Sequence, residues 1–163
     1  RLAGAEATSF FAGARALVVA RAPGRLDVMG GIADYSGSLV LERTITEAAC
    51  VAVGLAPGAR DVRVVSLGGE RAERTAEAAC PPEVLTDVGR ARAFFARDAR
   101  TRWAGYVLGA VPVLAEARGV EPPAGLRVFV ASDVPEGKGV SSSAALEVAA
   151  LQALAALAGT ALT

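Results

Sequence analysis

The chain has 163 residues, a length that suits one domain, and a domain of this size buries roughly 70% of the surface that its unfolded chain exposes. Its 17 basic and 17 acidic residues leave no net charge, which argues against binding to nucleic acid or to anionic membranes through a broad charged surface. Histidine is absent, and the cysteines, Cys50 and Cys80, lie far apart, so neither a disulfide framework nor a transition-metal site is expected.

Two stretches bear on the cellular location. The longest apolar run, residues 144–158, contains Glu147 and Gln152 and is shorter than the ~20 residues that a bilayer span needs. Residues 1–22 carry charged side chains without a clean apolar centre and make a poor signal peptide. We expect a soluble, cytoplasmic protein. Because the chain starts without methionine and ends soon after its strongest helix, we also expect a fragment of a longer protein.

The N-terminal half of the chain predicts a sheet. Residues 6–14 favour a short helix, and Pro23-Gly24 is a turn signal between two β-rich runs. Glycines and Tyr35 interrupt the pattern at residues 32–38, which should form a loop. Strands are predicted at residues 16–22, 25–29, 39–41, 45–55 and 62–67. This half therefore predicts an antiparallel or mixed sheet.

The C-terminal half changes to a helical period. Helices are predicted at residues 83–97 and 101–118, the second with a kink at Pro112. A strand at residues 126–131 follows, and then a glycine and serine loop that leads into a helix with a stop at Gly159. The order of these elements predicts an α+β fold with helices packed on one face of a sheet.

The loop at residues 134–145 is the strongest candidate for a binding site. Glycines let a backbone approach a ligand closely, and serines at a helix start place hydroxyls beside unpaired N–H groups, an arrangement that suits a polyphosphate. The candidate phosphate-binding residues are Gly137, Gly139, Ser141, Ser142 and Ser143. Serine is also a common helix cap without any ligand, and the spacing alone leaves both interpretations open. The loop matches neither a Walker motif nor a dinucleotide fingerprint.

Four stretches of the chain resemble motifs of the GHMP small-molecule kinases, which include the galactokinases and mevalonate kinases, and they occur in the same order as in that family. Residues 21–30, Arg-Ala-Pro-Gly-Arg-Leu-Asp-Val-Met-Gly, resemble the first family motif, and residues 134–144 resemble the second. Asp34-Tyr35-Ser36-Gly37 resembles the galactokinase sugar signature, and residues 103–109, Trp-Ala-Gly-Tyr-Val-Leu-Gly, are similar to a galactokinase helix. The resemblance implies that residues 1–163 form the N-terminal, ATP-binding domain of this fold, with a mixed sheet like that of ribosomal protein domain 2.

In this family the sugar hydroxyl attacks the γ-phosphate of ATP, mostly through positioning and charge stabilisation. Arg25 matches the arginine beside the reacting hydroxyl, where it would offset phosphate charge. Asp34 would accept hydrogen bonds from two ring hydroxyls, with an Asx turn before Tyr35 as the alternative role. Ser143 matches the serine that reaches Mg²⁺ in mevalonate kinase-like members, and Lys138 is expected to be solvated. The resemblance thus implies ATP, Mg²⁺ and a monosaccharide as ligands.

The sugar pocket departs from the galactokinase pattern at one place. Gly31-Ile32 stand where galactokinases have Glu-His, whose glutamate helps to hold the hydroxyl on the sixth carbon of galactose. Without these side chains a hexose hydroxymethyl would be left unpaired, at a cost of ~1–3 kcal/mol. Residues 21–41 are most similar to the L-arabinokinases, and a pentose fits this change. We therefore expect Gly31, Ile32, Asp34 and Tyr35 to line a site for L-arabinose, with galactose as the alternative.

The resemblance also implies what the chain lacks. Galactokinase-like members supply their catalytic aspartate and a third motif from sequence well beyond the second motif, and only about twenty residues follow Ser143. We expect the chain alone to hold parts of the two substrate sites without turning over. Two other readings stay open: a sugar and ATP sensor without catalysis, and a mevalonate-type reaction, against which Asp34-Tyr35 argues.

Overall fold

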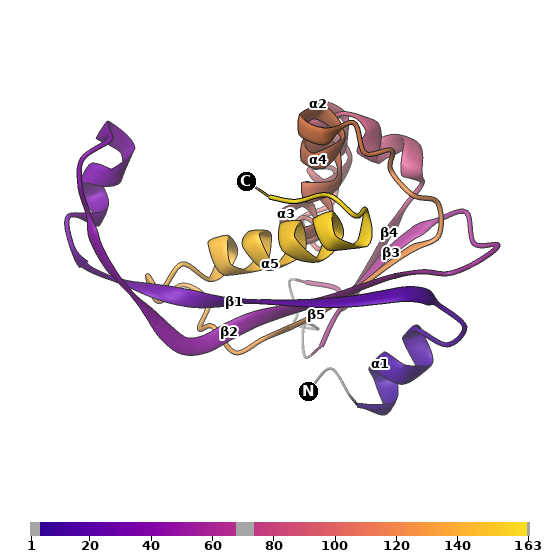
Figure 1. Cartoon of the computed structure of the whole chain (residues 1–163), viewed down its shortest axis with the longest axis horizontal. Coiled ribbons are helices and arrows are strands. Elements are labelled where there is room, and N and C mark those ends of the chain that lie inside the picture. The colour runs from indigo at the N-terminus through magenta and orange to yellow at the C-terminus, as the bar shows by residue number, and fades with distance from the viewer. Residues whose placement is uncertain (1–3, 68–73, 163) are drawn as a thin grey trace.

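The computed structural model describes residues 4–67 and 74–162, apart from the side chains of Ile32 and Asp34. It contains a mixed five-stranded sheet in the order β1-β2-β5-β3-β4, in which β3 and β5 are parallel and the other neighbours are antiparallel (Figure 1). The strands are β1 (Arg15–Met29), β2 (Leu41–Leu55), β3 (Val62–Ser66), β4 (Glu77–Cys80) and β5 (Leu126–Ser132). The α-helices are α1 (Ala5–Phe10), α2 (Val88–Phe95), α3 (Ala104–Leu108), α4 (Ala110–Arg118) and α5 (Ser142–Leu157).

The predicted α+β class is confirmed, with one correction to the layering. Helices α2 to α5 cover one face of the sheet and share a core with it, which includes Val53, Leu108 and Val128. Helix α1 lies on the opposite face (Figure 1), where Phe10 packs against Phe129 of β5 with ring centroids 5.9 Å apart. The sheet is therefore covered on both faces, because the aromatic residues of the short N-terminal helix need a partner surface of their own.

Helix α5 runs across β1 and β2 and carries the loop at its N-terminus (Figure 1). Its buried positions are mostly alanines, and Ala149, Ala150 and Ala153 are fully buried. Small side chains let the helix axis approach the sheet closely, which fixes the position of the helix start. The last turn ends before Gly159, which has a φ of +67°, as the sequence predicts.

The predicted turn at Pro23-Gly24 is wrong. Strand β1 continues through both residues, and the only sign of them is a shift in register between Pro23 and Arg25. Proline is tolerated there because β1 is an edge strand, where a missing N–H removes no ladder hydrogen bond on the open side. The long strands β1 and β2 form a hairpin that extends beyond the rest of the sheet (Figure 1).

The tip of this hairpin also differs from the prediction. Residues Gly31–Ser36 form a short 3-10 helix, η1, instead of a loop. The predicted strands at 39–41 and 45–55 are one strand, β2, and strand β4 was not predicted at all. Four residues of alternating exposure, with two alanines, are too weak a signal to identify a strand from the sequence.

Both predicted long helices are divided. A 3-10 turn, η2 (Pro82–Thr86), precedes α2, which begins after Asp87; this carboxylate accepts a hydrogen bond from the N–H of Arg90. The second run breaks at Gly109 into α3 and α4, and not at Pro112. Pro112 falls in the first turn of α4, where its missing N–H would have no helical partner in any case.

Candidate functional site

The loop between β5 and α5 has an unusual backbone conformation at three positions. Gly137 and Gly139 have φ angles of +70° and +71°, and a side chain in this left-handed region would be strained. Ser141 also has a positive φ, +57°, which is uncommon for a residue other than glycine. Three left-handed residues within five positions therefore shape the loop before α5, and strain of the kind found at Ser141 is typical of functional sites.

Ser141 is the N-cap of α5 by position, but its side chain makes no cap hydrogen bond. Instead its Oγ accepts a hydrogen bond from Nε of Arg25, at 3.1 Å. The plain capping role is therefore not what this hydroxyl performs. The first N–H groups of a helix that is 16 residues long remain without side-chain caps, and they favour an anion at this end.

Arg25 comes from β1 and joins the first sequence motif to the second. Besides its contact with Ser141, its guanidinium forms an ion pair of 2.9 Å with Glu42 on β2, and its main-chain N–H donates to the carbonyl of Val140 at 3.1 Å. The preceding Gly24 is buried, and a Cβ there would lie 2.9 Å from this same carbonyl oxygen. Glycine at position 24 therefore lets the loop pack directly on the strand.

A cavity of about 350 Å³ opens beside the start of α5. Its lining includes Ser142 and Ser143 at the start of α5, and Trp103 and Tyr106, which lie near or in α3. Two of its side chains carry buried N–H groups without a partner among the described residues: Nε of Arg74 and Nε1 of Trp103. Its lining residues are Ser66, Leu67, Arg74, Arg102, Trp103, Tyr106, Val130, Ser132, Glu136, Ser142, Ser143 and Leu146.

Arg74 is the centre of the polar contacts in this cavity. Its Nη1 pairs with Glu136 of the loop at 3.1 Å, and its Nη2 donates to Oγ of Ser66 at 2.8 Å. The guanidinium lies over the ring of Trp103, 4.8 Å from the centroid. Sequence analysis missed Arg74 and Glu136, since an isolated arginine after a strand carries no motif. Trp103 was identified only as part of a family-like helix.

The predicted sugar residues lie at the hairpin tip, on and beside η1. The N–H of Gly31 donates to Oδ2 of Asp27 at 2.9 Å, and a Cβ on Gly31 would come within 2.0 Å of that oxygen. The side chain of Tyr35 is almost fully exposed. The side chains of Ile32 and Asp34 lie outside the described structure, so the predicted roles of both residues remain predictions.

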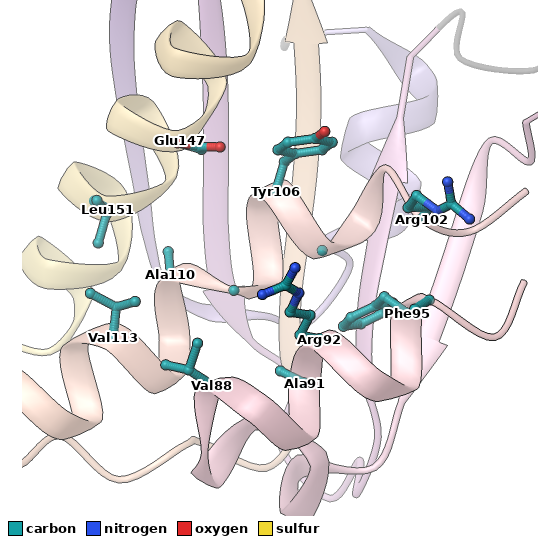
Figure 2. A pocket seen from close by; sticks show the side chains of 13 residues that line it. Val88, Ala91, Arg92, Phe95, Arg102, Tyr106, Ala110, Val113, Glu147 and Leu151 are labelled. Atoms are coloured by element: carbon teal, nitrogen blue, oxygen red, sulfur yellow. The ribbon is translucent and has the colours of Figure 1, made fainter. Parts of the chain in front are cut away.

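A second cavity, of about 670 Å³, lies between helices α2 to α5 (Figure 2). Figure 2 shows Arg92, Tyr106 and Glu147 around it, one each from α2, α3 and α5. Burial raises the pKa of Glu147, the one acidic group in this mostly apolar lining. The cavity shares Arg102 and Tyr106 with the cavity at the loop, but it contains none of the predicted site residues.

Other groups have simpler roles. Lys138 is exposed in the loop, as expected for a solvated side chain. Both cysteines are free thiols, and burial raises the pKa of Cys80 to about 12, so it stays protonated. Within the described residues, no group of three or more His, Cys, Asp or Glu side chains is arranged for a metal ion, and no helix is long and apolar enough to cross a membrane.

Comparison with known proteins gives two family matches. Residues 105–163 match the GHMP kinases N terminal domain, and residues 8–55 match the galactokinase galactose-binding signature. The first match contains the loop and α5, and the second contains the hairpin with Arg25 and the tip. The two sequence motifs that meet at Ser141 and Arg25 therefore fall in two separate family signatures.

Individual relatives agree with these matches. The chain is 44% identical to an L-arabinokinase of Arabidopsis thaliana, over 88% of this chain and 16% of that protein. It is 34% identical to a galactokinase of Chloroflexus aggregans, over 80% of this chain and 29% of that protein. It therefore spans less than a third of the length of either relative.

The fold agrees as well. The crystal structure of Lactococcus lactis galactokinase complexed with galactose matches with a TM-score of 0.73, at 20% identity, over 97% of this chain and 37% of that one. At this identity the likeness establishes the fold alone. The two family signatures and the 44% identity to the L-arabinokinase identify the chain as a member of the GHMP kinase family, related to the L-arabinokinases and galactokinases.

Proposed function

We propose that residues 1–163 are the N-terminal, ATP-binding domain of a sugar 1-kinase, and that the full protein transfers the γ-phosphate of ATP to the anomeric hydroxyl of L-arabinose. The observation that carries this proposal is the contact of Arg25 with Ser141, which joins the strand of the sugar hairpin to the loop at the start of α5. A kinase needs its acceptor and its phosphates side by side, and this contact connects the strand that leads to the predicted sugar residues with the predicted phosphate loop.

On the nucleotide side, the loop and the first turn of α5 would hold the phosphates. Backbone N–H groups near Gly137 and Gly139 and the hydroxyls of Ser142 and Ser143 are the available donors. Arg25, held by Glu42 on its other side, would offset the charge that develops on the transferred phosphoryl group.

Mg²⁺ fits this arrangement as an ion that arrives with the nucleotide. Ser143 offers one neutral oxygen, and Glu136 is already paired with Arg74, so the described residues do not form a protein cage. Mg²⁺ commonly keeps several waters and binds through substrate phosphates with few protein ligands, which agrees with a single serine hydroxyl. Bound there, the ion would neutralise phosphate charge.

On the sugar side, Asp34 would orient the ring hydroxyls, and Gly31 and Ile32 would leave no polar partner for a hexose hydroxymethyl. Similarity to the L-arabinokinase at 44% identity supports the pentose, and the galactokinase match keeps galactose as the alternative. The resemblance to galactokinases implies that a general base would come from outside residues 1–163. If no such base follows, the protein is a non-catalytic binder of sugar and ATP.

An ADP-release assay tests the proposal with the protein encoded by the full reading frame. L-Arabinose, D-galactose, glucuronic acid and mevalonate are compared at equal Mg-ATP. We expect the highest kcat/KM for L-arabinose, and a preference for galactose would overturn the pentose assignment. Asp34→Ala should abolish sugar turnover while nucleotide binding persists. Unchanged sugar affinity in this variant would favour the Asx-turn role of Asp34.

A further inference from the structure

We propose that Arg74 is a positioning residue of the nucleotide site, which joins the wall that receives the base to the loop that receives the phosphates. This inference rests on the proposed function and adds a residue that neither motif contains. Arg74 follows β3. It lies outside both family signatures, which match residues 8–55 and residues 105–163.

The contacts of Arg74 reach three parts of the fold. One nitrogen pairs with Glu136 in the loop, another donates to Ser66 at the end of β3, and the guanidinium plane covers Trp103 before α3. A planar guanidinium is suited to this task because it donates in several fixed directions and stacks on an aromatic ring at once. Glu136 thereby acquires a fixed position relative to Trp103 across the cavity.

The cavity also holds two donors that await an acceptor. Nε1 of Trp103 and Nε of Arg74 are buried and have no hydrogen-bond acceptor among the described residues. Trp103 as a whole is only 8% exposed, so water has little access to it. Buried donors are nearly always satisfied in folded proteins, so a pair of them at one cavity points to an acceptor supplied by a ligand. The ring nitrogens of a purine base have this character, and Ser142 and Ser143 of the predicted phosphate site line the same cavity.

Arg74 therefore acts in two directions. Through Trp103 it completes a flat, donor-bearing wall for the base, and through Glu136 it holds the loop where the phosphates bind. In the protein encoded by the full reading frame, we expect Arg74→Gln to raise the Kd and KM for ATP about tenfold, the loss that a charge-assisted hydrogen bond commonly gives, while the KM for the sugar stays within twofold. Arg74→Lys keeps the positive charge but lacks the planar guanidinium, so its Kd and KM for ATP should lie between those of wild type and those of Arg74→Gln.

Trp103 supplies a direct readout because it is the only tryptophan of the 163 residues. Mg-ATP should change its fluorescence emission in the wild-type chain, and the same titration measures the Kd of each variant. Trp103→Phe keeps a ring beneath Arg74 but removes the indole donor, and we expect it to raise the KM for ATP while Arg74 still orders the loop. Arg63→Gln is the matched control, since it removes an arginine paired with Asp61 and Glu77 away from the cavity.

A double-mutant cycle decides whether Arg74 works through the loop. If it does, Glu136→Gln should raise the Kd for ATP as well, and the Arg74→Gln/Glu136→Gln double variant should bind no more weakly than the worse single variant. Fully additive losses would overturn the proposed coupling, as would an ATP Kd within twofold of wild type in Arg74→Gln. If that variant does not fold, Arg74→Lys and Glu136→Gln carry the same test. Absence of ATP binding by the wild type would instead overturn the proposed function.

Discussion

At the scale of single residues, Ser141 combines an unfavourable backbone conformation with a side chain that does not cap its helix. Its φ of +57° is left-handed, and its hydroxyl accepts from Arg25 instead of capping α5. A helix that needed only a cap would not require this geometry. The conformation is explained if the residue serves the neighbouring site, where its hydroxyl fixes the guanidinium.

We predict different effects of Ser141→Gly and Ser141→Ala on stability but similar effects on nucleotide binding. Glycine accepts a left-handed conformation and alanine does not, so the glycine variant should be more stable by about 1 kcal/mol in urea unfolding. Both variants lose the acceptor for Arg25 and should weaken ATP binding. Equal stability of the two would show that residue 141 is not left-handed in solution.

The side chain of Asp27 occupies the space that a side chain at position 31 would need. Any side chain at this position would meet the carboxylate of Asp27, which caps η1 through the N–H of Gly31. The sequence indicated the loss of a glutamate at position 31 from the family pattern. It did not indicate that Asp27 occupies the space, because this contact depends on the fold of the tip.

Gly31→Glu should therefore lower turnover of L-arabinose without creating activity on galactose, since the new side chain must displace Asp27. The double variant Asp27→Ala/Gly31→Glu removes the clash, and we expect its kcat/KM ratio of galactose to arabinose to rise about tenfold over wild type. The measurement compares both sugars in the same ADP-release assay. An unchanged ratio would mean that position 31 does not select between pentose and hexose.

At the scale of secondary structure elements, the sequence identified strands more reliably than it identified their ends. Pro23-Gly24 is an ordinary turn signal, and nothing local to it shows that β1 lies at a sheet edge with a loop packed on Gly24. The break between α3 and α4 at Gly109 was not predicted, for a similar reason. Pro112 is the obvious interruption in the sequence, yet its place in the first turn of α4 makes it harmless.

The parallel pair β3 and β5 is fastened by a charge cluster at one end. Arg127 of β5 donates to the main-chain oxygen of Asp61 at 2.8 Å and pairs with its carboxylate at 2.9 Å. The hydrogen bond from Arg63, with Arg127 in addition, lowers the pKa of Asp61 to about 2. The charged form of this carboxylate is thus favoured by folding.

Asp61→Asn should lower the free energy of unfolding by about 1 kcal/mol at neutral pH. The loss is small because the cluster is partly exposed to solvent. A lowered folded-state pKa gives stability that is present above the ordinary value of 3.8 and is lost as the pH falls towards 2. Urea unfolding across this pH range should therefore show wild type and variant converging at the acid end. Arg60→Gln, beside the cluster, is the control and should show no such convergence.

At the scale of the whole molecule, the hairpin tip stands apart from the core. Met29, Tyr35 and Leu39 are apolar or aromatic and are largely exposed, whereas Phe129 and the valines beneath α5 are fully buried. The overall class and the two motifs could be predicted because they depend on local patterns. The exposed tip and the contacts of Arg74 could not, because they depend on which distant segments the fold brings together.

We predict that Met29→Ser and Leu39→Ser leave the free energy of unfolding within about 0.5 kcal/mol of wild type, because both side chains stay largely exposed to water in the folded chain. Phe129→Ala, which empties a buried site between α1 and the sheet, should cost about 3–5 kcal/mol. Urea unfolding measures all three. A large loss in Leu39→Ser would mean that the tip packs against a surface in solution.

The packing of Val140 on β1 has a thermodynamic consequence. Arg25 donates to the loop twice, through its main-chain N–H to Val140 and through its side chain to Ser141. Because these two hydrogen bonds connect β1 with the loop at α5, we expect a ligand that orders the predicted sugar site at the hairpin tip to order the loop as well. By linkage, sugar should tighten ATP binding by the same factor by which ATP tightens sugar binding, a cooperativity carried by one arginine and its neighbouring glycine.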